Sequence, residues 1–527
     1  MNISSRQHLR AGSKPLKYLT ILLIALWFSI SLPGCNLFQA NVSPDTSTQS
    51  TKTISPATAP LQRFDGITVN VVTRSGVIGV GVERRIPEFE SLTGAKVNLT
   101  MHDFGKVYDM LQADWSSASP KYDMAVAMPQ WLIDFVNANY LEDLTARVEA
   151  DAALQWEDIA PFFRNANAIH NKRIYGIPVD GDYHLLYYRT DLLQKAGLTP
   201  PLTWDDYLKV AQSFHGKDLN GDGTPDYGSC IAKEPGHIGF FMFNSILTSY
   251  LQSKGTGQGA FFDLETMRPL VKNEAFAKAL DIYKQTMAYG VPDDANLKFV
   301  EARKVFLSGR CALSIDWGDI PVLVIDPTLS KVINKVGAAM LPGSPKVLDR
   351  TTGKLTVCDK FVCPYAIDGI NHAPFAANLG YTGVISAKAA PDVKNAAYAF
   401  LSYISQPAQS NVDVTIGPTG FNPYRVSQFK DVAPWIQSGM STDVTNNYLG
   451  AIGITLSNSN MALDMKLPHA KRYQLEVLDP ALTDFMAGKI SREETMERVE
   501  QGWQKITDQV GRESQKTAYR YSLGLES

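Results

Sequence analysis

The short motifs that mark the commonest catalytic and nucleotide-binding sites are missing from this sequence of 527 residues. It has no G-x-S-x-G, H-E-x-x-H or Walker A pattern, which disfavours a serine hydrolase, a zinc protease or a nucleotide-binding enzyme. No C-x-x-C pair and no paired histidines accompany its five cysteines, so a zinc site has little support. The chain also lacks a strong positive charge, since its net charge is −3. We therefore expect no nucleic acid among the partners.

The apolar run at residues 18–30 (YLTILLIALWFSI) is too short to span a bilayer comfortably. It follows a basic segment without acidic residues and precedes LPGC at residues 32–35. Together these features resemble a bacterial lipoprotein signal. We therefore expect a signal peptide at residues 1–34, lipidation of Cys35, and a lipid anchor that holds the protein in the periplasm or on the outer face of the cytoplasmic membrane. An ordinary signal peptide with an incidental cysteine, or a transmembrane helix, is the alternative.

The chain after the predicted signal is mildly acidic and begins with a segment of low hydrophobicity. Residues 1–34 hold four basic residues and no acidic one, so the rest carries a net charge of −7. Residues 36–62 are mainly Ser, Thr, Pro and Ala without apolar periodicity, and we expect residues 35–65 to be a flexible tether. The remaining length suggests two or three domains with sizeable cores.

If Cys35 carries the lipid, four cysteines remain in an oxidising compartment, and three pairings are possible. Cys358 and Cys363 lie five residues apart in an insertion rich in turn-forming residues, which favours a local bridge. Cys230 would then pair with Cys311 by elimination. Four buried free thiols are the alternative.

Strand and helix patterns alternate from residue 67 onward. Residues 67–72, 96–101 and 122–128 read as strands, and residues 82–93 and 107–116 read as helices. Short connections between them favour a mostly parallel sheet covered by helices. Further helices are expected at residues 204–214, 238–252, 273–289, 295–308 and 391–405, and from about 481 to 512, where Ser491 and Glu494 form a capping box.

Six segments in order resemble one family, the extracellular solute-binding proteins of ABC importers, in particular the group of maltose and other sugar-binding proteins. The most specific is residues 174–214, with Y-G-I-P, the strand LLYYR and the helix start P-L-T-W. The others are residues 122–144, 306–317, 336–343, 380–409 and 486–506. The resemblance covers about residues 66–512.

The resemblance implies an α/β, two-lobed periplasmic-binding-protein-like (type II) fold with hinged crossing strands, and a ligand held between the lobes. Lobe one is expected at residues 66–177 and 344–412, and lobe two at residues 178–343 and 413–527. The implied partners are a small carbohydrate and the membrane subunits of an ABC permease, and we expect a monomer. The sequence departs from the family pattern at residues 346–374, an insertion that could reshape the cleft.

A sugar site needs aromatic rings for C–H faces, and carboxylates, amides or arginine for hydroxyls. The resemblance favours Trp317 as a ring platform and places Asp180, Asp182 and Tyr183 just past the Y-G-I-P crossover. Further candidates lie at strand ends or beside these residues, and they are Arg74, Trp131, Asp316 and Tyr381. The Gly/Pro-rich loop at residues 417–424 could also line the cleft. Trp131 could equally be a core residue, and Asp316 a solvated loop carboxylate.

Residues 218–226 (DLNGDGTPD) place oxygen-bearing side chains at the spacing of an EF-hand calcium loop. The candidate ligands are Asp218, Asn220, Asp222, Thr224 and Asp226. Ser229 stands where such loops carry a bidentate Glu. We expect a structural calcium there, with a metal-free Asx-rich turn as the alternative. No other cofactor is expected.

The function that these features predict is a lipid-anchored solute-binding protein, not an enzyme. An oligosaccharide, a disaccharide or a glycoside is the expected ligand, with polyols, glycerol phosphodiesters and peptides as alternatives. A secreted polysaccharide-active enzyme is the competing class. It would need two carboxylates across a cleft, such as Asp180 and Asp316, but no local motif supports that chemistry.

Overall fold

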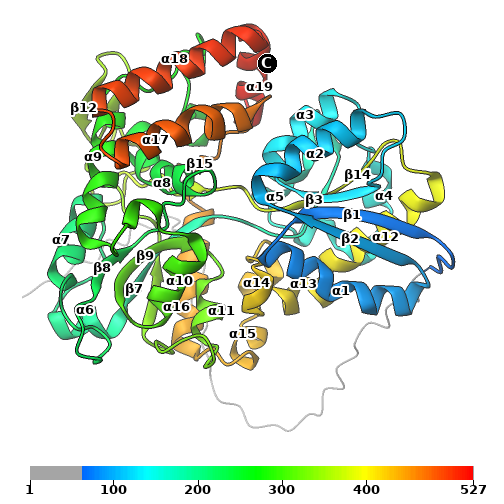
Figure 1. The fold of residues 1–527 in the computed structure, drawn as a ribbon, viewed down its shortest axis with the longest axis horizontal. Coiled ribbons are helices and arrows are strands. Elements are labelled where there is room, and N and C mark those ends of the chain that lie inside the picture. Colours follow the sequence, from blue (N-terminus) through cyan, green and yellow to red (C-terminus); the bar gives the residue numbers. More distant parts are fainter. Residues whose placement is uncertain (1–61, 526–527) are drawn as a thin grey trace, which may run out of the picture. The chain divides into compact units, whose positions relative to one another are not determined.

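The computed structural model describes residues 62–525, whose strands form two larger sheets. Figure 1 shows these sheets in two lobes, the first mostly blue and cyan, the second mostly green. The first sheet has the order β2-β1-β3-β14-β6, and its strands are β1 (Thr68–Arg74), β2 (Lys96–His102), β3 (Met124–Ala127), β6 (Ile177–Pro178) and β14 (Thr382–Ile385). The second has the order β10-β7-β9-β8, and its strands are β7 (His184–Arg189), β8 (Tyr227–Cys230), β9 (Cys311–Trp317) and β10 (Val336–Ala339).

The predicted parallel pairing holds for the N-terminal strands, because β1 runs parallel to both β2 and β3. Elsewhere the sheets are mixed: β14 is antiparallel to its neighbours, and so is β7. The shorter strands are β4 (Ile169–His170), β5 (Arg173–Ile174), β11 (Lys346–Asp349), β12 (Lys354–Val357), β13 (Phe375–Ala376) and β15 (Ala462–Leu463).

Helices bury their apolar faces against both sheets. Those of the first lobe are α1 (Val77–Thr93), α2 (Phe104–Ser116), α3 (Leu132–Asn137), α4 (Thr145–Glu149), α5 (Pro161–Phe163), α12 (Pro391–Ser405), α13 (Pro407–Asp413) and α14 (Val426–Lys430). Those of the second are α6 (Thr190–Ala196), α7 (Trp204–Phe214), α8 (Gly239–Leu251), α9 (Glu274–Thr286), α10 (Phe299–Leu307), α11 (Ile320–Val324), α15 (Ala433–Gln437), α16 (Thr442–Leu456), α17 (Asp479–Met486), α18 (Arg492–Val510) and α19 (Arg512–Ser522).

Several helix ends follow the sequence signals directly. Gly94 ends α1 with φ of 75°, a left-handed conformation that glycine adopts without strain. Thr203 caps α7 by accepting a hydrogen bond from the backbone N–H of Asp206. The predicted capping box of Ser491 and Glu494 is present at the start of α18. Local capping therefore fixes where these helices begin and end.

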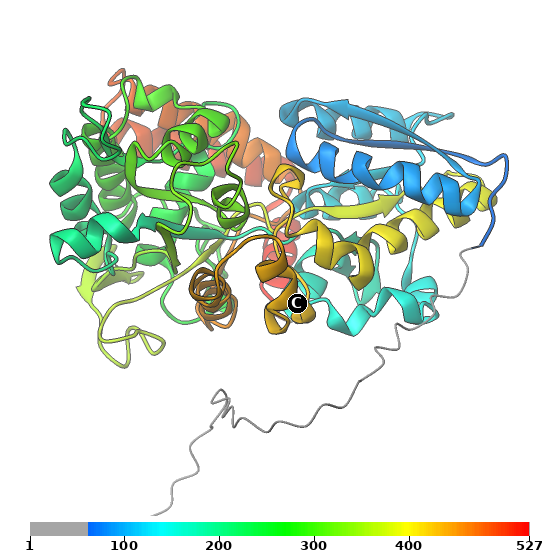
Figure 2. The same cartoon turned by 90° about the horizontal axis from the view of Figure 1, so that it is seen from below.

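Within the described chain, three segments cross between the lobes, as Figures 1 and 2 show from two sides. The first is residues 179–183, which join β6 directly to β7. The second runs from β10 back to β14, and the third from α13 to α16, which packs on β10. A few backbone torsions can change in such connections while each lobe keeps its core, which is the geometry of a hinge.

The second crossing contains a run of left-handed backbone. Asn378, Leu379 and Gly380 have φ values of 66°, 60° and 109°. Gly380 is required for a second reason, since a Cβ there would clash with the carbonyl oxygen of Asp180 on the first crossing. A bulky residue such as Leu379 adopts positive φ only at a cost of about 1–3 kcal/mol, so the surrounding contacts must hold this backbone in place.

Two segments pack in a different lobe from the predicted one. The hairpin β11–β12 lies in the insertion assigned to lobe one, yet it packs on α8 and α9 of the second lobe, where Arg350 donates to carbonyl oxygens of Leu251 and Gln258. Residues 413–430 were expected in lobe two, yet buried Arg425 pairs with Asp158 of the first lobe at 3.3 Å. An assignment of segments to lobes by chain order alone gives the wrong lobe here, because side-chain contacts with distant residues determine where each segment packs.

The predicted disulfides are confirmed. Cys230 at the end of β8 is bonded to Cys311 at the start of β9, and Cys358 is bonded to Cys363 beside the hairpin. The first bridge joins two neighbouring parallel strands of the second sheet. The second closes a loop of the insertion.

Among residues 62–525, no helix is both long and apolar enough to cross a membrane. The predicted signal peptide and Cys35 lie outside the described residues, as does nearly all of the predicted tether. Lipidation of Cys35 therefore stays a prediction.

Candidate functional site

A small cavity lies between the lobes, next to the crossing segments. The space in it that water centres can occupy is about 40 Å³, which is room for a few waters. Its apolar lining comes from Val77, Ile78, Phe104, Ile238, Phe241, Phe299, Trp317 and Gly420. Its polar lining comes from Arg74, Asp182, His237, Arg303, Asp319, Asn378, Tyr381 and Asn422. Both lobes and the crossings contribute, so any change at the hinge would reshape the cavity.

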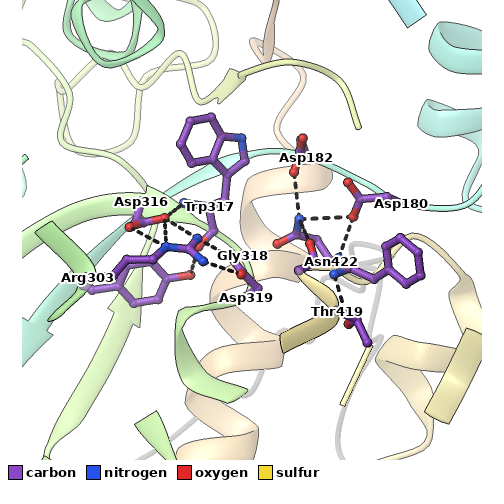
Figure 3. Close-up of polar contacts among 12 residues, drawn as sticks. Asp180, Asp182, Arg303, Asp316, Trp317, Gly318, Asp319, Thr419 and Asn422 are labelled. Atoms are coloured by element: carbon purple, nitrogen blue, oxygen red, sulfur yellow. Dashed lines mark hydrogen bonds and ion pairs between the residues drawn. The ribbon is translucent and has the colours of Figure 1, made fainter. Parts of the chain in front are cut away.

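On the side of the second lobe, Arg303 on α10 holds the turn that follows β9. Its guanidinium donates to Asp316 and Asp319, with closest distances of 2.6 and 2.5 Å, as Figure 3 shows. Burial alone would lower the pKa of Arg303, but the two carboxylates raise it. Burial raises the pKa of Asp316 to about 6 against the opposing attraction of Arg303. The arginine therefore stays charged and is largely occupied by this pair.

The Trp317 ring is fixed by neighbouring aromatic rings. The rings of His184, Phe299 and Phe241 meet it edge-on, with centroid distances of 4.3, 5.4 and 6.0 Å. Asp316 accepts a hydrogen bond from the backbone N–H of Trp317 at 2.7 Å. These contacts hold the indole rigidly at the cavity wall.

A cluster of carboxyl and amide groups joins the three crossings. Asn422 donates through Nδ2 to Asp180 at 3.1 Å and to Asp182 at 2.7 Å, and Figure 3 shows this bridge. Asn378 donates to the second oxygen of Asp182 at 2.8 Å. Neither aspartate forms an ion pair within residues 62–525. Burial raises the pKa of Asp180 to about 7 and that of Asp182 well above its usual range.

Four cavity-lining side chains carry a buried polar atom without a hydrogen-bond partner in the described structure. They are Nε2 of His237, Nε1 of Trp317, Oδ1 of Asn378 and Oδ1 of Asn422. Nδ1 of His237 donates to Glu234 at 3.1 Å, which leaves Nε2 as an acceptor in the neutral ring. Buried polar atoms are almost always satisfied, so this mixed set of donors and acceptors indicates a place for a ligand.

Residues 76–410 match the family model described as bacterial extracellular solute-binding protein. The chain belongs to this family. It is 30% identical over 206 residues to the mannitol-binding protein of Pseudomonas aeruginosa, a match that covers 38% of this chain and 44% of that protein. The matched part is thus less than half of that relative. Solute-binding proteins of this family are transport components, so the expectation that the chain is not an enzyme is confirmed.

Solved structures confirm the predicted two-lobed α/β fold of a solute-binding protein. A ribitol complex from Agrobacterium radiobacter K84 has a TM-score of 0.65 at 20% identity, over 84% of this chain and 100% of that one. Maltose-bound MalE3 of T. maritima has a TM-score of 0.66 at 18% identity, over the same shares of the two chains. Identities this low establish the fold and leave the ligand open.

Half of the predicted ligand residues of this solute-binding protein line the cavity. Those that do are Arg74, Asp182, Trp317 and Tyr381. Those that do not are Trp131, Asp180, Tyr183 and Asp316. Trp131 is buried in the first lobe and meets the ring of Tyr108 edge-on at 5.5 Å. Direct contact of each residue with a ligand stays a prediction.

Most of the aromatic wall and the two amides, Asn378 and Asn422, are not predicted from the sequence. Phe104 begins α2 and Phe299 begins α10, while Phe241 lies in the first turn of α8. No motif distinguishes these positions from core phenylalanines. Asn422 could have been found, because it lies in the Gly/Pro-rich loop already suspected of lining the cleft.

The predicted calcium ligands of the loop at residues 218–226 already have protein partners. The carboxylate of Asp218 accepts from the backbone N–H groups of Gly221 and Gly223, and that of Asp222 accepts from Thr224. Buried Asp226 pairs with Arg310 at 2.6 Å. Among residues 62–525, no group of three or more His, Cys, Asp or Glu is arranged to hold a metal ion. Calcium binding stays a prediction. A fall in the melting temperature on chelation would support it, and Asp222→Ala should abolish that effect of the chelator.

Proposed function

We propose that this protein binds one small neutral polyol or sugar in the cavity between its lobes and delivers it to the membrane subunits of an ABC importer. The observation that carries the proposal is the set of unpartnered polar atoms that line a cavity walled by aromatic rings. Each hydroxyl can both donate and accept, so a polyhydroxylated solute can satisfy donors and acceptors in the same site.

The apolar walls fit the rest of such a solute. The rings of Phe241, Phe299 and Trp317 offer contact area for C–H groups, and polar groups lie between them. Arg74 is available for hydroxyl oxygens: its guanidinium donates to Tyr381 at 3.3 Å and forms no ion pair within the described chain. Asp182 and Asp319 offer further carboxyl oxygens to the hydroxyl groups of a solute.

The size of the cavity favours a polyol or monosaccharide over an oligosaccharide. The cavity has space for only a few waters, so a bound solute requires the lobes to open, and a smaller solute requires less opening than an oligosaccharide. A polyol is supported by the similarity to a mannitol-binding protein and to a structure in complex with ribitol. The similarity to maltose-bound MalE3 supports a disaccharide as the second candidate. The family places this step outside the cytoplasm. A lipid at Cys35 would hold the protein near its permease.

The ligand would act by closing the hinge. A solute that contacts both lobes stabilises the arrangement in which both line the cavity, and a permease can distinguish that arrangement from the open one. The carboxyl and amide cluster of Asp180, Asp182, Asn378 and Asn422 ties the three crossings beside the cavity. Ligand contact with Asp182 or the amides would therefore bear directly on the hinge.

A thermal-shift panel tests the solute class. The panel contains mannitol, ribitol, glucose, maltose, maltotriose, glycerophosphocholine and a tripeptide, each at 5 mM. A ligand present at 100 times its Kd adds about 2.7 kcal/mol to the free energy of unfolding, which gives a clear rise in Tm. We expect the largest rise with a polyol or monosaccharide. Stabilisation by the peptide or the phosphodiester alone, or by none of the panel, contradicts the proposal.

A further inference from the structure

A second depression lies at the boundary between the lobes and shares no lining residue with the cavity. The first lobe contributes residues 162–172 in part, the second contributes Thr256 and the end of α19, and Leu463 and Lys466 complete the lining. Figures 1 and 2 both place the C-terminal end of α19 at this boundary. Its volume of about 710 Å³ leaves room for a small organic molecule. We call it the α19 groove.

Lys466 is a buried cation at the wall of the α19 groove. Its side chain donates to the carbonyl oxygen of Ala166, and both residues line the groove. The residue is only 6% exposed, and within residues 62–525 no carboxylate pairs with it. Burial lowers its pKa to about 8. An ammonium buried without an anion is costly, and two of its three N–H donors have no partner in the described structure.

The rest of the lining suits the opposite charge on an apolar body. Lys172 is exposed at the rim, and no Asp or Glu is among the described residues that line the groove. Phe162, Ile169 and Leu463 supply apolar surface on both sides of the boundary. A ligand with one anionic group and an apolar remainder would therefore satisfy both parts of the lining.

We propose that the α19 groove is a second binding site, which takes an organic monoanion with its carboxylate on Lys466 and its apolar body against Phe162, Ile169 and Leu463. Because both lobes line the groove, a bound anion would also join them at a point away from the cavity. The proposal stands on this groove alone and does not depend on which solute the cavity binds.

Benzoate is the probe, and benzyl alcohol is its uncharged counterpart of nearly the same shape. Ligand-observed saturation-transfer NMR on the whole exported protein should detect benzoate binding and little or none for benzyl alcohol. Lys466→Met keeps the length and apolar stem of the side chain and should weaken benzoate binding at least tenfold. Lys505→Met, at an exposed position of α18 that does not line the groove, serves as the matched control and should change the affinity less than threefold.

A pH series gives a second measurement that does not rely on a variant. Benzoate affinity should fall as the pH rises from 7 through about 8, since Lys466 then loses its charge. Near Lys466, burial holds the pKa of His170 at about 4, so that ring stays neutral throughout. Burial raises the pKa of Asp464 to about 6, so this carboxyl is mostly deprotonated by pH 7 and cannot account for a change near pH 8.

Three results would overturn the proposal. One is the absence of benzoate binding, and another is equal binding of benzoate and benzyl alcohol, which would leave only an apolar groove. The third is benzoate affinity that neither Lys466→Met nor deprotonation near pH 8 changes. Loss of binding in Lys466→Met together with the pH profile of the wild type supports it.

Discussion

At the residue scale, Trp317 differs from Trp131 in what surrounds its ring. Trp317 lines the cavity, and its buried Nε1 has no hydrogen-bond partner in the described structure. Trp131 packs edge-on against the ring of Tyr108 in the first lobe and does not line the cavity. The two tryptophans therefore form a matched pair for separating ligand binding from stability.

Trp317→Ala should lower the affinity for the cavity ligand by roughly thirtyfold, about 2 kcal/mol, because a rigid ring and a donor are both removed. Trp131→Ala should instead lower the free energy of unfolding by roughly 3–5 kcal/mol and leave the affinity unchanged. Isothermal titration and denaturant unfolding of both variants measure the two effects. The same affinity in Trp317→Ala and wild type would remove this residue from the site.

Asp180 should make the protein less stable as the pH rises. Burial raises its folded-state pKa to about 7, whereas the unfolded value is about 4. Between these values the folded state binds more protons, so the contribution of Asp180 to stability is largest below about pH 4 and declines up to about pH 7. Asp180→Asn mimics the protonated form, and its Tm relative to wild type should rise across this window and level off above it.

Asp326→Asn is the control for this pH effect. Hydrogen bonds from Thr328 lower the pKa of partly exposed Asp326, so its contribution has the opposite sign: it is present above about pH 4 and lost as pH falls. The control variant should gain no stability as the pH rises. Melting curves from pH 4 to 8.5 compare the three proteins, and parallel curves for Asp180→Asn and wild type would contradict the shifted pKa.

The sequence could predict those site residues that lie at strand ends or beside a recognisable crossover. Arg74 is the last residue of β1, so its place at a strand end indicated it, and the family resemblance indicated Asp182 just past the Y-G-I-P segment. Phe241 and Phe299 could not be predicted, because a buried phenylalanine near a helix start has the same local pattern whether it lines a cavity or fills a core. Only the packing of the two lobes makes that distinction.

At the element scale, the two disulfides should differ in how much they stabilise the fold. Cys230 and Cys311 are 81 residues apart, and Cys358 and Cys363 are five apart. The entropy lost by the unfolded chain grows with loop length, and the chain-entropy estimates are about 4.5 and about 2 kcal/mol. Replacing the first pair with serine should therefore lower the unfolding midpoint more than replacing the second. Denaturant unfolding measures both, and equal losses would contradict this ranking.

Elements with strong local signals were predicted closely, and elements that depend on distant contacts were not. The bounds of α7 and α12 agree with the sequence patterns, since a Thr cap and an N-terminal Pro define their starts. The lobe of the hairpin β11–β12 was missed because Arg350 docks on carbonyl groups about 90 residues earlier in the chain. Nothing in the hairpin's own residues specifies that partner.

At the scale of the whole molecule, residues of the three crossing segments both connect the hinge and line the cavity. Asn422 and Asn378 each bridge from a later crossing to Asp182 on the first one, and all three residues line the cavity. Positive φ at Asn378 and Leu379 adds a strained backbone at the same place. A solute bound here would therefore act on the hinge through residues that it touches.

Isothermal titration with the ligand of the panel that gives the largest rise in Tm tests the central claim most directly. The bound solute is then released by denaturing the protein and identified by mass spectrometry. The account predicts one polyol or sugar per chain, reversible binding, and recovery of the solute unaltered. It also predicts weaker binding in Asn378→Ala and Asn422→Ala, which lose unpartnered cavity oxygens. Saturable binding of no polyol or sugar, or recovery of a chemically altered solute, would contradict it.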